Sequence, residues 1–190
     1  NRIFCPGSAY RDDETLLRAV SDLEVEVWRT RLGGEPGIQR EQVGRATIIS
    51  ACNLPYHEYV SACLESSVVV ISAHSSDKPV GLTSLLECMA LGRPVIITRG
   101  LSSYDYAIDN VTAIEFDEGD SQALKEGIRR LLDDPGLASR LTQAANASLV
   151  HEFDLSKTGP EFSRLLIAMI SSPSPSETVV RNPLAGNVSR

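Results

Sequence analysis

The sequence predicts an α/β domain with a doubly wound parallel sheet of about six strands and helices on both faces. Short runs of β-branched residues, such as 68–71 and 95–97, suit parallel strands whose two faces are both covered. Segments with a helical spacing of apolar residues separate these runs, and this alternation is typical of a parallel sheet. With 190 residues, of which 42% are hydrophobic, the chain suits one globular domain.

The first half of the chain holds three predicted strands and two predicted helices. An apolar stripe at helical spacing indicates a helix over 15–23, and Pro55 is suited to start another over 56–64. The segment 29–45 is polar and carries glycines at 33, 34 and 37, so we expect a long mobile loop there. Strands are predicted over 3–5, 25–28 and 47–50.

The second half continues the alternation to the end of the domain. Strands are predicted over 68–72, 94–98 and 112–116, and helices over 82–91, 104–109, 121–133, 136–150 and 157–170. Residues 171–190 are rich in serine and proline and lack a core pattern. We therefore expect a disordered tail there, after a domain that covers 1–170.

The composition limits the classes of partner and of chemistry. A net charge of −7 argues against a generic nucleic-acid-binding surface, so no nucleic-acid partner is expected. The four cysteines, at 5, 52, 63 and 88, form no CxxC pair, which favours buried reduced thiols over disulfides or a metal site. No stretch is long and apolar enough to span a membrane, and no signal peptide is expected.

A glycine turn at Gly81 separates the strand over 68–72 from the helix over 82–91. A helix N-terminus behind a strand of an open α/β sheet presents unpaired N–H groups, and these suit a phosphate. The N–H groups of Gly81, Leu82 and Thr83, with the Thr83 hydroxyl, are therefore the predicted phosphate cradle. The alternative is an ordinary turn into a helix.

Glu87 is the acid on this helix. It follows Thr83 by four residues, so the two side chains share one face, while the apolar positions 85, 86 and 89 can point to the core. A carboxylate on that face can accept two hydrogen bonds from a ligand. The alternative is a capping box, in which Glu87 bonds back to the backbone of Ser84.

This arrangement of turn, helix acid and following strand resembles a known signature. The residues that carry the resemblance are Gly81-Leu82-Thr83, Leu86-Glu87-Cys88-Met89-Ala90 and Gly92-Arg93-Pro94-Val95. They are similar to the sugar-nucleotide signature of retaining GT-B glycosyltransferases, the group-one set of family four. The likeness runs from about Ile3 to Ile170 and implies that 1–170 is the C-terminal, Rossmann-like, nucleotide-sugar-binding half of a GT-B fold.

The resemblance implies an activity: transfer of a sugar, of the hexosyl type, from a UDP-, GDP- or ADP-sugar to an acceptor, with the anomeric configuration retained. GT-B enzymes generally work without a bound metal, so no metal and no cofactor are expected, and the nucleoside diphosphate sugar is a substrate. Two alternatives stay open. One is a degenerate scaffold module that has lost donor binding, and the other is a sugar-nucleotide epimerase.

The resemblance also implies roles for single residues. Glu87 holds the donor ribose through its hydroxyls. Arg11 stands at the lysine position that meets the diphosphate, so it keeps that positive charge. The family's arginine position falls near Gly7-Ser8, where there is no cation, and Gly7 is expected to contact the donor there. Arg29 or Arg31 is a candidate substitute, with solvated surface arginines as the alternative.

The family's second acid, which contacts the transferred sugar, falls at Pro79. Asp77 is the nearest carboxylate and can serve as the sugar contact if the loop bulges, with a solvated loop aspartate as the alternative. His74, on the same loop, can donate a hydrogen bond to the donor or its sugar. Asn53, in the loop over 51–54, lies where related enzymes receive the nucleobase.

The chain begins at Asn1, two residues before an apolar run that suits the first strand of a domain. We therefore expect a piece of a longer polypeptide, whose missing N-terminal domain carries the acceptor side. Such a piece is expected to bind donor weakly and to be inactive alone. Reduced cysteines and a nucleotide-sugar substrate favour a cytoplasmic location, peripheral at the inner membrane face if the acceptor is a lipid.

Overall fold

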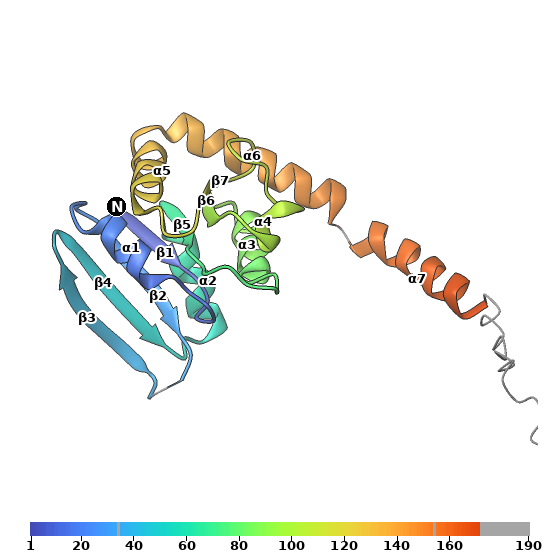
Figure 1. Cartoon of the computed structure of the whole chain (residues 1–190), viewed down its shortest axis with the longest axis horizontal. Helices are drawn as coiled ribbons and strands as arrows, with labels where there is room; N and C mark the ends of the chain where they lie inside the picture. The colour runs from blue at the N-terminus through green and yellow to red at the C-terminus, as the bar shows by residue number, and fades with distance from the viewer. Residues whose placement is uncertain (34, 154, 172–190) are drawn as a thin grey trace, which may run out of the picture. The chain divides into compact units, whose positions relative to one another are not determined.

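The computed structural model describes residues 1–33, 35–153 and 155–171, and it has a seven-stranded, mostly parallel sheet flanked by helices (Figure 1). The chain separates into two compact units, Asn1–His151 and Glu152–Arg190. The first unit holds the sheet. The second contributes helix α7 (Leu155–Ser171) to the described residues. The predicted α/β fold class is therefore confirmed.

The strand order of the sheet is β3-β4-β2-β1-β5-β6-β7. The strands are β1 (Arg2–Cys5), β2 (Glu26–Arg31), β3 (Gly37–Val43), β4 (Ala46–Cys52), β5 (Val68–Ile71), β6 (Val95–Thr98) and β7 (Ile114–Phe116). Every neighbouring pair is parallel except β3 with β4. The strands β2, β3 and β4 all lie on one side of β1. The chain then crosses to the other side of β1, where β5, β6 and β7 follow in order. The order therefore reverses between β1 and β5, and strand ends at such a switch point form a ligand crevice.

Helices cover both faces of the sheet because neighbouring residues of each buried strand point to opposite faces. Ile3 and Val68 pack in one core with α1 and α5, whereas Phe4 and Val69 pack in a second core with α2 and α3. The helices of the first unit are α1 (Asp13–Val20), α2 (Tyr56–Leu64), α3 (Leu82–Ala90), α4 (Leu101–Tyr104), α5 (Ser121–Asp133) and α6 (Pro135–Glu152). This two-sided cover accounts for the continuous apolar runs of the strands.

The prediction of a long mobile loop over 29–45 is wrong. Strand β2 continues to Arg31, and β3 pairs antiparallel with β4 from Gly37 opposite Cys52 to Val43 opposite Ala46. The sequence of β3 is polar because the strand lies at the sheet edge and is exposed on both faces; even Ile38 is 56% exposed. An exposed edge strand lacks the apolar pattern that marks the buried ones, and it makes the sheet seven strands rather than six.

The prediction of a short helix over 104–109 is also wrong. Helix α4 covers Leu101–Tyr104, and Gly100 N–H donates to Ser103 Oγ at 3.1 Å at its start. The chain then turns, because the N–H groups of Tyr106 and Ala107 both donate to Ser103 O, at 3.0 and 2.8 Å. Of the tail expected over 171–190, Ser171 ends α7, and the other residues lie outside the described part of the chain.

Three of the four cysteines, Cys5, Cys63 and Cys88, are buried as predicted, and Cys52 is half-buried. All four are free, and the sulfurs of Cys63 on α2 and Cys88 on α3 lie 3.7 Å apart in the second core. Among the helices of the described residues, none combines the length and the apolar character needed to cross a lipid bilayer.

Candidate functional site

Two loops meet at the switch point of the sheet: residues 6–12 after β1 and residues 72–81 after β5. Asp12 N–H donates to Ser72 O at 3.1 Å, and the Ser72 hydroxyl donates to Asp12 O at 3.0 Å. His74 N–H donates to Tyr10 O at 2.9 Å. These bonds join segments 60 residues apart in sequence at the carboxyl ends of β1 and β5.

Arg11 lies between these loops. Its Nε donates to Pro6 O at 2.9 Å and its Nη1 to Ala9 O at 3.3 Å. The next residue, Asp12, caps helix α1 by accepting from Thr15 N–H at 3.0 Å, which fixes the backbone beside the arginine. Burial lowers the pKa of the Arg11 guanidinium, but the ordinary value is so high that the group stays charged at neutral pH.

Helix α3 begins beside Arg11. Its N-cap residue is Gly81, with a φ of +88°, and no described side chain caps the helix. A Cβ built on Gly81 would lie 2.8 Å from Ile71 Cγ2 and 3.5 Å from Arg11 Nη1, so a glycine is needed for this close approach. The first N–H groups of α3 therefore lie next to a half-buried cation, and both favour an anion.

A cavity of about 360 Å³ opens between Arg11 and the start of α3. It is lined by residues 7–11 and 79–84 together with Leu32. The structure thus brings together five of the predicted donor contacts: Gly7, Arg11, Gly81, Leu82 and Thr83. We call this the first cavity.

Glu87 lies in the second turn of α3 and is half-buried. Its Oε1 lies 3.5 Å from the hydroxyl of Tyr56 on α2. The capping-box alternative is wrong, because Ser84 is the third residue of α3 and not its N-cap. Leu85 and Met89 are buried as predicted, so the carboxylate stays on the side of the helix that faces Tyr56.

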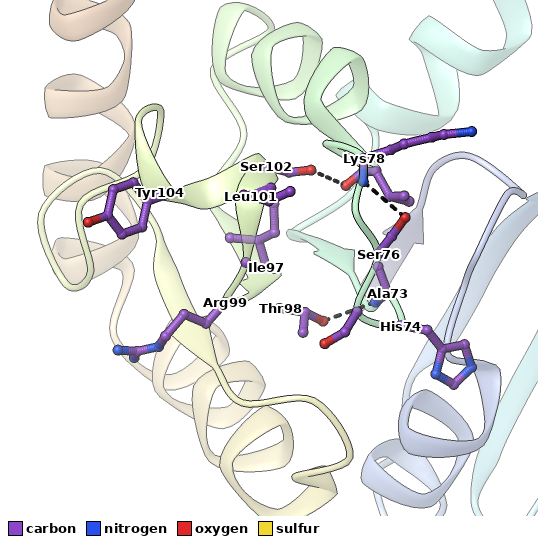
Figure 2. Close-up of a pocket in the computed structure, with 13 residues that line it drawn as sticks. Ala73, His74, Ser76, Lys78, Ile97, Thr98, Arg99, Leu101, Ser102 and Tyr104 are labelled. Atoms are coloured by element: carbon purple, nitrogen blue, oxygen red, sulfur yellow. Dashed lines mark hydrogen bonds between the residues drawn. The ribbon is translucent and has the colours of Figure 1, made fainter.

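A second cavity, of about 290 Å³, lies between the loops that follow β5 and β6 (Figure 2). Val80 lines both cavities. Ser102 Oγ donates to Val80 O, and Ala73 N–H donates to Thr98 Oγ1 at 2.9 Å, so hydrogen bonds tie the two loops together. The lining residues are 73–76, Lys78, Val80, 97–102 and Tyr104.

His74 and Tyr104 lie on opposite sides of the second cavity (Figure 2). His74 Nδ1 is 3.0 Å from Glu118 Oε1, and Ser75 N–H donates to Glu118 Oε2 at 3.0 Å. The bonds from Ser75, and then that from His74, hold the pKa of Glu118 below its ordinary value because they favour the charged carboxylate. The loop after β5 is therefore anchored to the segment that follows β7.

Two of the predicted residues lie away from this arrangement, and a third position lacks the acid that the family has there. Asp77 is exposed, lines neither cavity, and its Oδ1 lies 3.5 Å from Ser76 Oγ. Asn53 Oδ1 accepts from Gly33 N–H at 3.2 Å, so its side chain contacts the start of the β2–β3 connection. Pro79, at the family's second-acid position, lines the first cavity without supplying a carboxylate.

Arg29 and Arg31 have carboxylate partners. Arg29 Nε donates to Ser50 Oγ at 2.7 Å and its Nη2 to Glu41 Oε1 at 2.7 Å, while Arg31 pairs with Asp13. Both guanidinium groups are thus held by neighbours, which favours Arg11 as the cation available to a ligand. Within the described ranges, no group of three or more His, Cys, Asp or Glu side chains is placed to hold a metal ion.

Sequence reasoning did not single out Tyr56, Tyr59 and Glu118. Helix α2 brings both tyrosines to α3, and their three-residue spacing on a predicted helix was a signal that they share a face. Glu118 meets Ser75 across 43 residues of sequence, so no local pattern marks that contact.

Comparison with known families gives one match. The profile of the family described as "Glycosyl transferases group 1" matches residues 39–148, which is more than half of the chain. This range includes helix α3 and the loop that follows β5. A search of curated proteins found no significant match.

Solved structures share the fold. Sucrose-phosphate synthase from Thermosynechococcus elongatus is 18% identical, with a TM-score of 0.70, over 90% of this chain and 46% of that one. Anabaena HepE in complex with UDP-glucose is 16% identical, with a TM-score of 0.69, over 88% and 48%. The C-terminal domain of the group 1 protein LpcC from Francisella tularensis is 14% identical, with a TM-score of 0.59, over 81% and 85%. The chain thus spans slightly less than half of the first two structures.

Proposed function

The chain belongs to the glycosyl transferases of group 1, and from this premise we propose that it is the donor-binding half of a retaining glycosyltransferase. The proposed reaction moves a sugar, of the hexosyl type, from a nucleoside diphosphate sugar to an acceptor. One observation carries this proposal. The Arg11 guanidinium lies between Gly7 and the start of α3, at the switch point of the sheet.

The charges at this place suit a diphosphate. The N-terminus of α3 carries a partial positive charge, and the N–H groups of Leu82 and Thr83 lie in its first turn. Arg11 adds a full charge on a planar group that can bond two phosphate oxygens at once. Both groups stabilise the negative charge that grows on the leaving diphosphate as the sugar departs. We therefore propose that donor binding needs no divalent cation.

Glu87 is the proposed ribose ligand. Its carboxylate lies in the turn of α3 after Thr83, on the side that faces Tyr56. A carboxylate accepts hydrogen bonds from two vicinal hydroxyls, which a ribose offers. HepE has been solved with UDP-glucose, which supports a nucleoside diphosphate sugar as the ligand class for this chain as well.

The acceptor site and the remaining catalytic groups are proposed to lie on a second domain of the same polypeptide. The first two structures above are each about twice as long as this chain, which supports that division. The first cavity lies beyond the carboxyl ends of β1 and β5, where a facing domain can close over it. We expect the chain to bind nucleotide without transferring sugar, and turnover by the purified chain would contradict this. The free cysteines support a reducing, cytoplasmic setting.

The test is thermal unfolding of the chain with UDP, GDP, ADP and their sugar conjugates. A ligand that binds only the folded state raises the midpoint by mass action. We expect one base to raise it selectively, with and without a chelator, and Glu87→Ala and Arg11→Ala to reduce the rise strongly. Glu126→Ala and Arg18→Ala, at exposed helix positions outside both cavities, are the matched controls and should keep it.

One observation favours a second candidate, a scaffold module that has lost donor binding. Pro79 and Ser8 stand where the family has an acid and a cation, and both line the first cavity. A folded sample whose midpoint no nucleotide raises would favour the scaffold over the transferase half. A selective rise that needs Glu87 would exclude it.

A further inference from the structure

Tyr59 places a buried hydroxyl beside Glu87. The ring lies on α2, edge-on to Phe4 with centroids 5.2 Å apart, and stacked on Tyr56 with centroids 5.9 Å apart and 12° between the planes. Among the described residues, no hydrogen bond of ordinary geometry reaches the hydroxyl oxygen, although solvent does not reach it either. A buried polar group without a partner costs free energy, so this one calls for an explanation.

Three side chains of α3 interact electrostatically with the Tyr59 hydroxyl: Ser84, Glu87 and Cys88. Burial, followed by the charges of Cys88 and Glu87, raises the pKa of Tyr59 far above its ordinary value. The hydroxyl therefore keeps its proton at neutral pH and can act only as a neutral donor or acceptor. Of the three neighbours, Glu87 offers the strongest acceptor, because a charged carboxylate accepts better than a hydroxyl or a thiol.

We propose that Tyr59 is a positioning residue for Glu87: when a nucleotide binds, the Tyr59 hydroxyl donates to the carboxylate and fixes the orientation in which it meets the ribose. This inference rests on the proposed function, since it assigns Glu87 a ribose. The Tyr59 hydroxyl gains a hydrogen-bond partner when the ribonucleotide binds. Because the hydroxyl is unpaired in the free protein, forming this bond stabilises the bound state and raises the affinity for the ribonucleotide. Tyr56, 67% exposed, approaches the same carboxylate from the solvent side.

A ligand without ribose hydroxyls distinguishes a positioning role of Tyr59 from a role in packing alone. The probe is whichever of UDP, GDP and ADP binds most tightly, compared by calorimetry with its 2′,3′-dideoxy analogue. In the wild type, the ribonucleotide should bind more tightly than the analogue. In Tyr59→Phe, we expect the affinity for the ribonucleotide to fall about tenfold and that for the analogue to stay the same. The unfolding midpoint should be unchanged or higher, because the variant removes a buried unpaired hydroxyl.

Two further variants complete the experiment. Glu87→Gln should lose the preference for the ribonucleotide, and adding Tyr59→Phe to it should cause no further loss, because Tyr59 acts through Glu87. Tyr106→Phe is the matched control, since Tyr106 packs against the same core as Tyr59 and lines neither cavity. It should keep the wild-type preference.

The possible failures point to different causes. If Tyr59→Phe keeps the wild-type preference while Glu87→Gln loses it, or if it weakens both ligands equally, or lowers the midpoint by several degrees, the positioning role is overturned. If Glu87→Gln itself keeps the preference, or the wild type binds none of the three nucleotides, the proposed function fails, and the positioning role fails with it.

Discussion

The guanidinium of Arg11 occupies the space that a side chain at Gly7 would need, because a Cβ built on Gly7 would lie 2.2 Å from Arg11 Nη2. A Cβ at Gly81 would lie 3.5 Å from Nη1 of the same group. Two glycines from loops after different strands thus border one cation. The missing side chains are what leave the guanidinium room beside the helix N-terminus.

Gly7→Ala should therefore displace Arg11. The new methyl group meets the guanidinium, and the φ of +78° at this position disfavours any residue with a Cβ. We expect nucleotide affinity to fall by about tenfold and the free energy of unfolding by about 1 kcal/mol, measured by calorimetry and by urea unfolding.

Gly92→Ala is a control that introduces backbone strain without displacing the Arg11 guanidinium. Gly92 also has a positive φ, +68°, but a Cβ there would make only an ordinary 3.8 Å contact with Thr142 Cγ2. We expect a similar loss of stability and an unchanged nucleotide affinity. Equal affinities for the two glycine variants would show that Arg11 does not need the space at Gly7.

Arg11→Lys should bind nucleotide more weakly than the wild type and more tightly than Arg11→Ala. The lysine keeps the charge but loses the planar group, which can bond two phosphate oxygens and also reaches Pro6 O and Ala9 O. Titrations at low and high salt should show the wild type and the lysine variant weakening as salt rises, and the alanine variant weakening less.

The charge-matched control is Arg18→Lys, on the exposed side of α1 where Arg18 pairs with Glu14. It should leave both the affinity and its salt dependence unchanged. If Arg11→Lys binds as well as the wild type, the guanidinium contributes only its charge.

Glu118→Ala should lower the unfolding midpoint at neutral pH, with an effect that disappears in acid. The pKa of Glu118 is lower in the folded protein, chiefly because Ser75 and then His74 bond to the carboxylate. Such a group stabilises the fold above its unfolded pKa, about 4.3, and the contribution is lost as the pH falls through the folded value. Midpoints of wild type and variant should converge below that range.

Glu126→Ala, at an exposed position on α5, controls for the loss of one negative charge. Its difference from the wild type should not follow the same pH course. A Glu118→Ala difference that persists in acid would mean that the carboxylate charge is not what anchors His74 and Ser75.

Thiol labelling should distinguish Cys52 from the other three cysteines. Cys52 is half-buried, whereas burial raises the pKa of Cys5 to about 12 and the side chains of Cys63 and Cys88 lie in the core. At pH 8 we expect one thiol to react in the native protein and four in denaturant. Cys52→Ser should remove the native reaction.

Labelling in denaturant also tests the close pair on α2 and α3. The 3.7 Å separation of the Cys63 and Cys88 sulfurs is a contact between reduced thiols. Two reactive thiols in place of four would show that this pair has been oxidised to a disulfide.

The sequence predicted the buried part of the fold and missed the exposed part. The strands of the inner sheet have continuous apolar runs, such as Val68–Ile71, because both of their faces are covered. Strand β3 has no such run, since its position at the edge removes the need for one. Helix α4 has four residues and no room for a periodic pattern, so its position was predicted three residues too late.

The candidate site divides in the same way. Gly81, Thr83 and Glu87 lie within seven residues of one another, so their spacing predicts that they share a helix end. Arg11 was predicted from the resemblance, and the pairing of distant strands brings it to that helix. Tyr59 could not be predicted as a neighbour of Glu87, because the packing of α2 on α3 has no signature in the sequence.

The pairing of β1 with β5, Ile3 opposite Val68 and Phe4 opposite Val69, also sets the order of events as the chain folds. During synthesis, at about 5–20 residues per second, Arg11 emerges long before Gly81. The anion site has no form until β5 has closed that long segment against β1, and pairings so distant in sequence form slowly. We therefore expect a nucleotide to bind only after β5 has paired with β1, so that its binding would report this pairing.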